Sequence, residues 1–192
     1  SEFNFSGKRY HVVSYGVSKR TGKLDYDEIR DMAREYKPKM IIAGYTSYPW
    51  APDWETFADI AREVGAVLLA DISHPAGMVI AGAFPSPVGI ADITTFTTHK
   101  TLCGPRGAVI MTTDEEMANK IDMAVFPGEQ GGPHTQKFAA MAVAFKIAQG
   151  EPDVLVLLTD YSEGGLIAKQ RMTTGLDQVD VIASGGNSHL SF

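Results

Sequence analysis

Residues 94–107, Thr94-Thr-Phe-Thr-Thr-His-Lys-Thr-Leu-Cys-Gly-Pro-Arg-Gly107, run from a β-prone segment into a tight turn, with a lysine, Lys100, between the two. Three hydroxyls and one imidazole flank this amine, on Thr97, Thr98, Thr101 and His99. Upstream, Ala66-Val-Leu-Leu-Ala-Asp71 has the apolar run of a buried strand and ends on a carboxylate. Strand and helix patterns alternate before it, which predicts parallel strands, and ligands bind at the carboxyl ends of such strands. Asp71 and Lys100 are therefore predicted to face one site.

A carboxylate and an amine at two strand ends, with hydroxyls between them, fit a site for pyridoxal 5′-phosphate. In such a site, Lys100 holds the aldehyde as a Schiff base, and Asp71 pairs with the protonated pyridine nitrogen. That proton makes the ring an electron sink, which carbanion chemistry at an amino acid needs. Taken alone, Asp71 also fits a helix N-cap or a satisfied loop carboxylate.

The motif around Lys100 resembles the cofactor-lysine motif of serine hydroxymethyltransferases. The similarity extends closely over residues 3–148 and returns at residues 184–190. It is carried by further motifs, namely Asp71-Ile-Ser-His74, Pro85-Ser-Pro87 and Val125-Phe-Pro-Gly128 with Gln130-Gly-Gly-Pro133. The resemblance implies the large domain of a fold-type I pyridoxal-phosphate enzyme, a three-layer α/β/α domain with a mostly parallel sheet.

The resemblance implies catalytic roles for four residues of the central stretch. Besides Lys100, Thr97 is implied to assist exchange of the amine on the cofactor, and His99 and Arg106 to orient groups around the lysine. Arg106 also fits a structural cation that bridges carbonyl groups in the Gly-Pro-Arg-Gly turn. Thr97 and His99 are implied cofactor contacts as well, and no metal is expected.

Further cofactor contacts are implied in three other segments. Thr46 follows a predicted strand and is implied to lie near the phenolic oxygen, and His74 near the ring or that oxygen. Gly131 and Gly132 expose backbone N–H groups to an anion, and the resemblance implies that their loop reaches a partner subunit's cofactor phosphate. Other interpretations stay open: a turn-capping hydroxyl at Thr46, a packed core histidine at His74, and a flexible connector at 125–133.

Local patterns predict the order of elements. Capping residues and apolar periodicity predict helices, and short β-prone runs predict strands. The predicted helices cover about 25–36, 53–64, 114–124 and 134–148, and the predicted strands 10–14, 39–44, 66–71, 90–96 and 107–112. The large-domain part is expected at 1–150, lacking N-terminal strands. Residues 151–192 are expected to form a divergent connector toward a missing small domain, and 151–158 looks like a strand.

Composition limits the possible partners and the compartment. The 192 residues carry a formal charge of −6, which points away from nucleic acid and anionic membranes. No signal peptide or membrane-length apolar run is visible. Cys103 is the only cysteine, so a reducing, cytoplasmic location is expected. Cys103 fits a small filler beside Lys100 and, alternatively, a nucleophile.

The implied activity is transfer of the hydroxymethyl group of serine to tetrahydrofolate, giving glycine and methylenetetrahydrofolate. Serine, glycine and the folate are thus the implied small-molecule partners, and a homodimer or tetramer, or association with missing segments, is expected. Because the family's upstream ring-stacking histidine and downstream carboxylate-binding arginine are missing, we expect the chain alone to be inactive.

Two other function classes stay open. One is a non-catalytic module with a structural or regulatory role, and the other is a different fold-type I enzyme, such as a threonine aldolase or an aminotransferase. The Gly-Pro-Arg-Gly turn and the Gln130-Gly-Gly-Pro133 loop weigh against the second of these.

Overall fold

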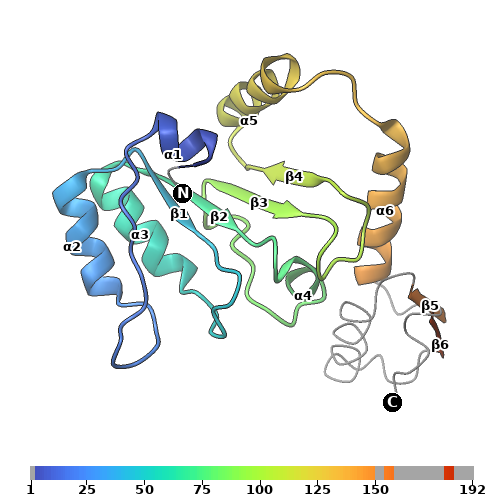
Figure 1. The fold of residues 1–192 in the computed structure, drawn as a ribbon, viewed down its shortest axis with the longest axis horizontal. Coiled ribbons are helices and arrows are strands. Elements are labelled where there is room, and N and C mark those ends of the chain that lie inside the picture. Colours follow the sequence, from blue (N-terminus) through green and yellow to red (C-terminus); the bar gives the residue numbers. More distant parts are fainter. Residues whose placement is uncertain (1–2, 150–153, 158–179, 184–192) are drawn as a thin grey trace.

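A four-stranded sheet organises the part of the chain that the structure describes. The computed structural model describes residues 3–149, 154–157 and 180–183. The strands stand in the order β1 (Met40–Ala43), β2 (Val67–Asp71), β3 (Ile93–Thr97) and β4 (Ala108–Met111) (Figure 1). The first three are parallel and β4 runs antiparallel to β3. The α/β class with a mostly parallel sheet is therefore confirmed, as are the strands predicted at about 39–44, 66–71, 90–96 and 107–112.

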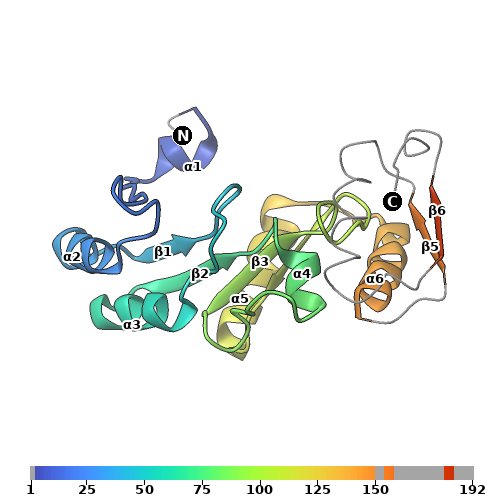
Figure 2. The same cartoon turned by 90° about the horizontal axis from the view of Figure 1, so that it is seen from below.

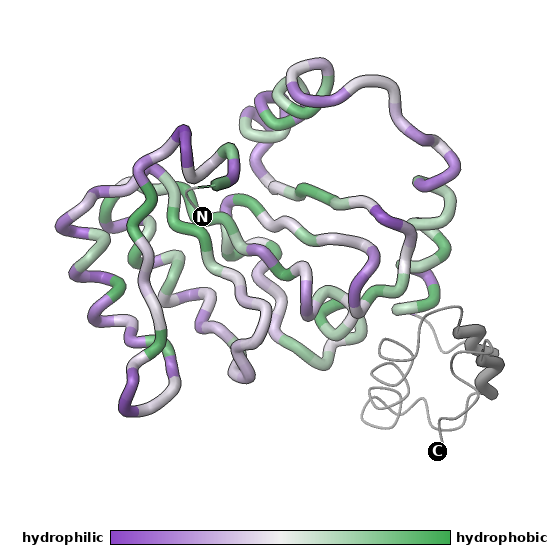
Figure 3. The backbone as a smooth tube through the Cα atoms, in the orientation of Figure 1, coloured by the Kyte–Doolittle hydropathy of each residue, from purple (hydrophilic) through white to green (hydrophobic). Residues whose placement is uncertain are grey.

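Two capped amphipathic helices flank the first strands. Asp25 and Asp53 cap α2 (Tyr26–Tyr36) and α3 (Trp54–Val64), each accepting a hydrogen bond from a backbone N–H in the first turn. Both helices alternate between hydrophilic and hydrophobic residues (Figure 3). The apolar side of α3 is buried against the sheet, with Phe57 and Ile60 fully buried. A left-handed residue ends each helix, Lys37 after α2 and Gly65 after α3.

The remaining elements follow the strands in turn. They are α1 (Phe5–Arg9), α4 (Ala76–Ile80), α5 (Glu115–Met123), the π-helical turn η1 (Ala124–Glu129), α6 (Thr135–Gln149), and the parallel pair β5 (Val154–Leu157) and β6 (Asp180–Ala183). Helix α6 packs near the end of β3, where the rings of Phe145 and Phe96 meet edge to face at 6.1 Å. The predicted helices at 25–36, 53–64, 114–124 and 134–148 are thus confirmed within one or two residues.

The two faces of β1 differ in burial. Ile41 and Ala43 are buried on the side of α3, whereas Met40 and Ile42 are 42% and 58% exposed on the other side. In the view from below, α3 and α1 lie on opposite sides of the strands (Figure 2). Helix α1 buries none of its residues, so it leaves this second side of β1 largely open.

One predicted strand is absent, one helix was not predicted, and most of the expected C-terminal connector falls outside the described residues. Residues 10–14 form no strand, because in the described part of the chain no strand pairs with them, and a β-prone run needs a partner. Helix α1, capped by Asn4, was not predicted. The strand expected at 151–158 is confirmed as β5, but the rest of the expected connector and the motif at 184–190 lie almost wholly outside the described residues.

The structure predicts that Gly44→Ala destabilises the fold. A Cβ at Gly44 would overlap the backbone oxygen and the Cβ of Asp71. We expect a loss of about 1–3 kcal/mol in the free energy of unfolding, measured by denaturant titration. The matched control is Gly16→Ala, because no atom lies within 4 Å of its Cβ position, and it should lose nothing. Equal stability of the two variants would contradict the close approach.

The N-cap of α3 should make the free energy of unfolding depend on pH in the acidic range. Asp53 accepts hydrogen bonds from the backbone N–H and the hydroxyl of Thr56, and these bonds hold its pKa below the ordinary value. This stabilisation is present above about pH 4 and is lost as the pH falls through the lowered pKa. Asp53→Ala should cost about 1 kcal/mol at neutral pH. Asp53→Asn should keep a side chain that can cap the helix, and its free energy of unfolding should fall less on acidification than that of the native chain. If the free energy of unfolding depended on pH identically in the two proteins, Asp53 would not contribute to acid sensitivity.

Candidate active site

A polar cavity of about 100 Å³ lies where β1 and β2 end. Seven residues line it: Gly44, Tyr45, Thr46, Asp71, Ser73, His74 and Lys100. Four of them, Thr46, Asp71, His74 and Lys100, are residues that the sequence pointed to. The structure therefore brings the predicted amine, carboxylate, imidazole and hydroxyl around one space, from three segments that lie 25 to 54 residues apart.

The register of the parallel strands carries Asp71 to this cavity. Ala43 pairs with Ala70 and Asp71 with Thr95, so β1, β2 and β3 end side by side. Gly44 then passes so close to Asp71 that a side chain would not fit. The Asp71 carboxylate accepts a hydrogen bond from the Ser73 N–H at 2.9 Å, a local turn that orients the carboxylate.

Two threonines, one of them fully buried, fix the turn that carries Lys100. Thr98 is fully buried; its N–H donates to the Gly107 carbonyl, and its own carbonyl accepts from the Gly104 N–H at 2.7 Å. The Thr101 hydroxyl donates to the His74 carbonyl and accepts from the Gly77 N–H at 3.0 Å. A side chain at Gly77 would overlap the Thr101 backbone, so the start of α4 sits directly against the lysine turn.

Lys100 and His74 form a direct hydrogen bond in the cavity. The Lys100 Nζ lies 3.1 Å from the His74 Nε2. An ammonium group can only donate, so when Lys100 is charged this ring nitrogen is the acceptor and carries no proton. Burial lowers the pKa of His74, the positive charge of Lys100 lowers it further, and the Asp71 carboxylate opposes both effects. Geometry and electrostatics thus both favour a neutral His74.

Two buried polar atoms beside the lysine have no hydrogen-bond partner among the described residues. They are the Thr97 Oγ1 and the His99 Nδ1. Buried polar atoms are normally paired, and unpaired ones mark a place for a missing partner. Together with an amine that can bond an aldehyde and a carboxylate in the same cavity, they fit a polar cofactor bearing an aldehyde.

Five predicted site residues lie outside the cavity lining. Thr97 and His99 flank Lys100 in the chain but do not line the cavity. Arg106 is exposed in the turn before β4, and Gly131 and Gly132 are exposed between η1 and α6. Their expected roles therefore stay predictions. Conversely, Gly44, Tyr45 and Ser73 line the cavity but were not predicted. Tyr45 lies two residues after the end of β1 and Ser73 two residues after the end of β2, so position next to a strand end was the signal for both.

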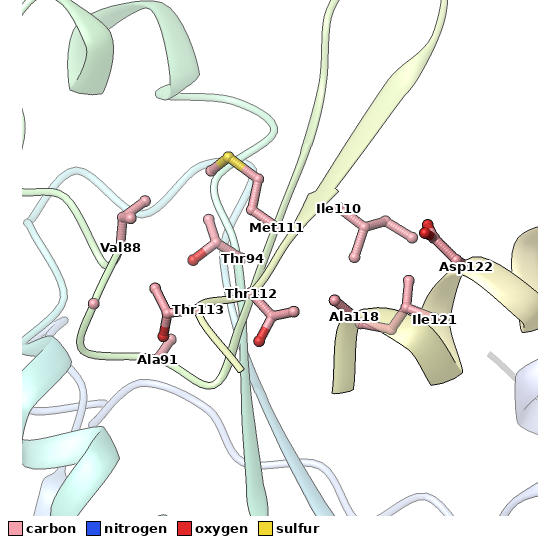
Figure 4. Close-up of a pocket in the computed structure, with 11 residues that line it drawn as sticks. Val88, Ala91, Thr94, Ile110, Met111, Thr112, Thr113, Ala118, Ile121 and Asp122 are labelled. Carbon is pink, nitrogen blue, oxygen red and sulfur yellow. The ribbon is translucent and has the colours of Figure 1, made fainter. Parts of the chain in front are cut away.

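A larger cavity of about 370 Å³ lies elsewhere, between residues 88–91, β4 and α5 (Figure 4). Side chains of Ile110, Ala118 and Ile121 contribute much of its wall, and Asp122 is its only ionisable lining residue. It offers no amine and no imidazole. Chemistry rather than size therefore places the candidate site at the smaller cavity.

The described residues contain no group of three or more His, Cys, Asp or Glu side chains able to hold a metal ion. Among them, no helix has the length and apolar character needed to cross a membrane.

The fold and the cavity define a class of protein: an α/β domain with a lysine and an aspartate facing one site at the ends of parallel strands. The family model described as serine hydroxymethyltransferase matches residues 1–191. The chain therefore belongs to the serine hydroxymethyltransferase family, a family of transferases.

Curated relatives agree with this assignment. Serine hydroxymethyltransferase of Alcanivorax borkumensis is 50% identical over 190 residues, covering 97% of this chain and 44% of the relative. Those of Endomicrobium trichonymphae and Acinetobacter baylyi are 46% and 44% identical, each covering 99% of this chain and 45% of the relative. The chain thus spans less than half the length of these relatives.

The Lys100–His74 contact predicts a low titration midpoint for His74. By NMR, His74 should titrate below the ordinary histidine value of about 6.5. Lys100→Met should raise its pKa, because a positive charge is removed, and Asp71→Asn should lower it further. Because the pKa of His74 is lowered in the folded state, protonation of His74 reduces the free energy of unfolding only as the pH falls below about 6.5. A midpoint that responds to neither variant would contradict the shared cavity.

Proposed function

We propose that this chain is part of a serine hydroxymethyltransferase, which transfers the hydroxymethyl group of serine to tetrahydrofolate and leaves glycine. The supporting observation is that Lys100 and Asp71 line one cavity at the carboxyl ends of the strands. The proposed cofactor is pyridoxal 5′-phosphate, and the proposed setting is one-carbon metabolism in the cytoplasm. Membership of the family and the names of the relatives support the same activity.

The cofactor supplies an aldehyde for an amine and a ring that withdraws electrons once its nitrogen is protonated. Lys100 is the proposed point of attachment, and Asp71 is the proposed partner of that ring nitrogen. Thr97 Oγ1 and His99 Nδ1 are buried and have no hydrogen-bond partner in the described part of the chain, and they are the proposed polar contacts next to Lys100. Thr46 lines the cavity with Lys100 and Asp71, which supports its proposed contact with the phenolic oxygen.

His74 has a proposed role in moving a proton. Lys100 has to lose a proton before its nitrogen can form a bond to carbon. The His74 Nε2 lies 3.1 Å from that nitrogen and accepts its hydrogen bond. It is therefore placed to take the proton from Lys100, and the Asp71 carboxylate favours the imidazolium that results.

Three further residues outside the cavity lining have proposed roles. Arg106 is proposed to orient groups around Lys100. Gly131 and Gly132, whose exposed backbone is open to a ligand, are proposed to bind the cofactor phosphate of a second copy in a dimer or tetramer.

The attachment site can be tested without measuring turnover. We expect pyridoxal 5′-phosphate to be fixed to Lys100 by borohydride reduction and located by peptide mass. Lys100→Ala should abolish the adduct on that peptide, and the exposed Lys19→Ala should not change it. Asp71→Asn should raise the half-saturating concentration about tenfold or more, because a charge-assisted hydrogen bond is lost. Equal labelling of all exposed lysines would contradict the proposal.

A second candidate function is a domain that binds the cofactor without turnover. It is favoured by the cavity lining, which contains no arginine to bind a substrate carboxylate among the described residues. Carbon transfer from labelled serine to tetrahydrofolate separates the two: the enzyme function predicts labelled folate, and the binding function predicts an adduct on Lys100 without it.

A further inference from the structure

A pair of tyrosine hydroxyls lies beside the candidate site and is not used by the proposed chemistry. The Tyr15 and Tyr45 hydroxyl oxygens are 2.9 Å apart. The Tyr15 hydroxyl also donates to the Ile42 carbonyl at 2.7 Å. Tyr45 lines the cavity between Gly44 and Thr46, whereas Tyr15 comes from the N-terminal segment.

The direction of these hydrogen bonds follows from counting protons. A phenol has one proton to donate, and a carbonyl can only accept. Tyr15 uses its proton on Ile42, so Tyr45 must donate to the Tyr15 oxygen. The result is an ordered chain of hydrogen bonds from Tyr45 to Tyr15 to the Ile42 carbonyl, which we call the phenol chain.

The Ile42 carbonyl needs this donor because it faces the free edge of the sheet. The Lys39 carbonyl accepts from the Val67 N–H of β2, and backbone groups alternate along a strand. The carbonyl groups of residues 39 and 41 therefore point toward β2, and that of Ile42 points away from it. Strand β1 is the first strand of the sheet order, so this side has no strand neighbour in the described residues.

Tyr15 is also the anchor of an irregular segment. Of residues 11–16, it is the only one that is not exposed. Its ring lies 6.0 Å from that of the buried Phe57. The phenol chain thus joins three parts of the molecule: the N-terminal segment, the edge of β1 and the residue next to Thr46.

We infer that Tyr15 and Tyr45 are positioning residues of the candidate site, holding the loop after β1 so that Thr46 faces Lys100 and Asp71. This inference rests on the proposed function, because the site it positions is that of the aldehyde cofactor. In this arrangement Tyr15 acts through its hydrogen bond to Tyr45, and Tyr45 acts through the backbone of Thr46.

The ionisation of the two phenols is consistent with this order. Burial raises the pKa of Tyr45, and the negative charge that Tyr15 can carry and the hydrogen bond donated to it raise it further. Burial also raises the pKa of Tyr15, but the bond that Tyr15 accepts from Tyr45 lowers it. Opposite effects of one bond on its two partners are expected when Tyr45 is the donor.

The test uses the 192-residue chain with Tyr15→Phe, Tyr45→Phe and both changes together. The affinity for pyridoxal 5′-phosphate is read from the fraction of Lys100 fixed by borohydride at increasing concentration. Tyr45→Phe loses one hydrogen bond and should weaken binding about threefold, whereas Tyr15→Phe loses two and should weaken it about tenfold. The double variant should bind the cofactor no more weakly than Tyr15→Phe, because the hydrogen bond between Tyr45 and Tyr15 is already lost in that single variant.

The matched control is Tyr26→Phe. Its hydroxyl accepts from the Asp53 N–H at 2.8 Å, and its ring packs on Phe57, but it is not part of the phenol chain. It should lower the melting temperature without changing the half-saturating concentration. Binding by Tyr15→Phe equal to that of the native chain, or effects that simply multiply in the double variant, would overturn the inference.

An alkaline titration of tyrosine absorbance supplies a second readout on the folded proteins. In the native chain the pKa of Tyr45 should lie above the ordinary value for a tyrosine, and Tyr15→Phe should bring it down. An unchanged Tyr45 titration would also overturn the inference. Absence of any adduct on Lys100 in the native chain would instead reject the proposed function, and with it the site that these phenols position.

Discussion

Parallel, in-register pairing of β1, β2 and β3 is the constraint on which the site depends. Each pair aligns the carboxyl ends of two strands. The chain therefore leaves the sheet at the same end of all three strands, at Gly44, at Asp71 and after Thr97. The missing side chain at Gly44 then lets two strand ends approach within backbone contact. A shift of one residue in either pair would turn Asp71 to the other face of the sheet and empty the cavity of its carboxylate.

Short hydrogen bonds convert this strand alignment into a fixed arrangement of side chains. Ser73 links β2 to β3, because its N–H donates to Asp71 and its hydroxyl accepts from the Thr97 N–H at 3.0 Å. Thr101 links the lysine turn to the segment that carries His74. Each link is local, yet together they place an amine beside an imidazole at 3.1 Å. A site held by rigid elements and their turns needs little rearrangement to bind a ligand.

Much of this arrangement could be predicted from the sequence, because it rests on local signals. Asp25, Asp53 and Asp114 are N-caps whose helices begin where expected. The site was indicated by polar residues at two strand ends, namely Asp71 and the threonines before Lys100. The strand expected at 10–14 failed because strand formation depends on a neighbour rather than on propensity. The phenol chain could not be predicted either, since Tyr15 and Tyr45 meet only after the sheet edge has formed.

We propose that one cavity holds the cofactor between Lys100 and Asp71, and a crystal structure of the 192-residue chain grown with pyridoxal 5′-phosphate would test this placement. We expect continuous density from the Lys100 Nζ to a ring whose nitrogen lies within hydrogen-bonding distance of the Asp71 carboxylate. Cofactor density in the larger cavity beside β4 and α5, or on an exposed lysine with this cavity empty, would contradict it.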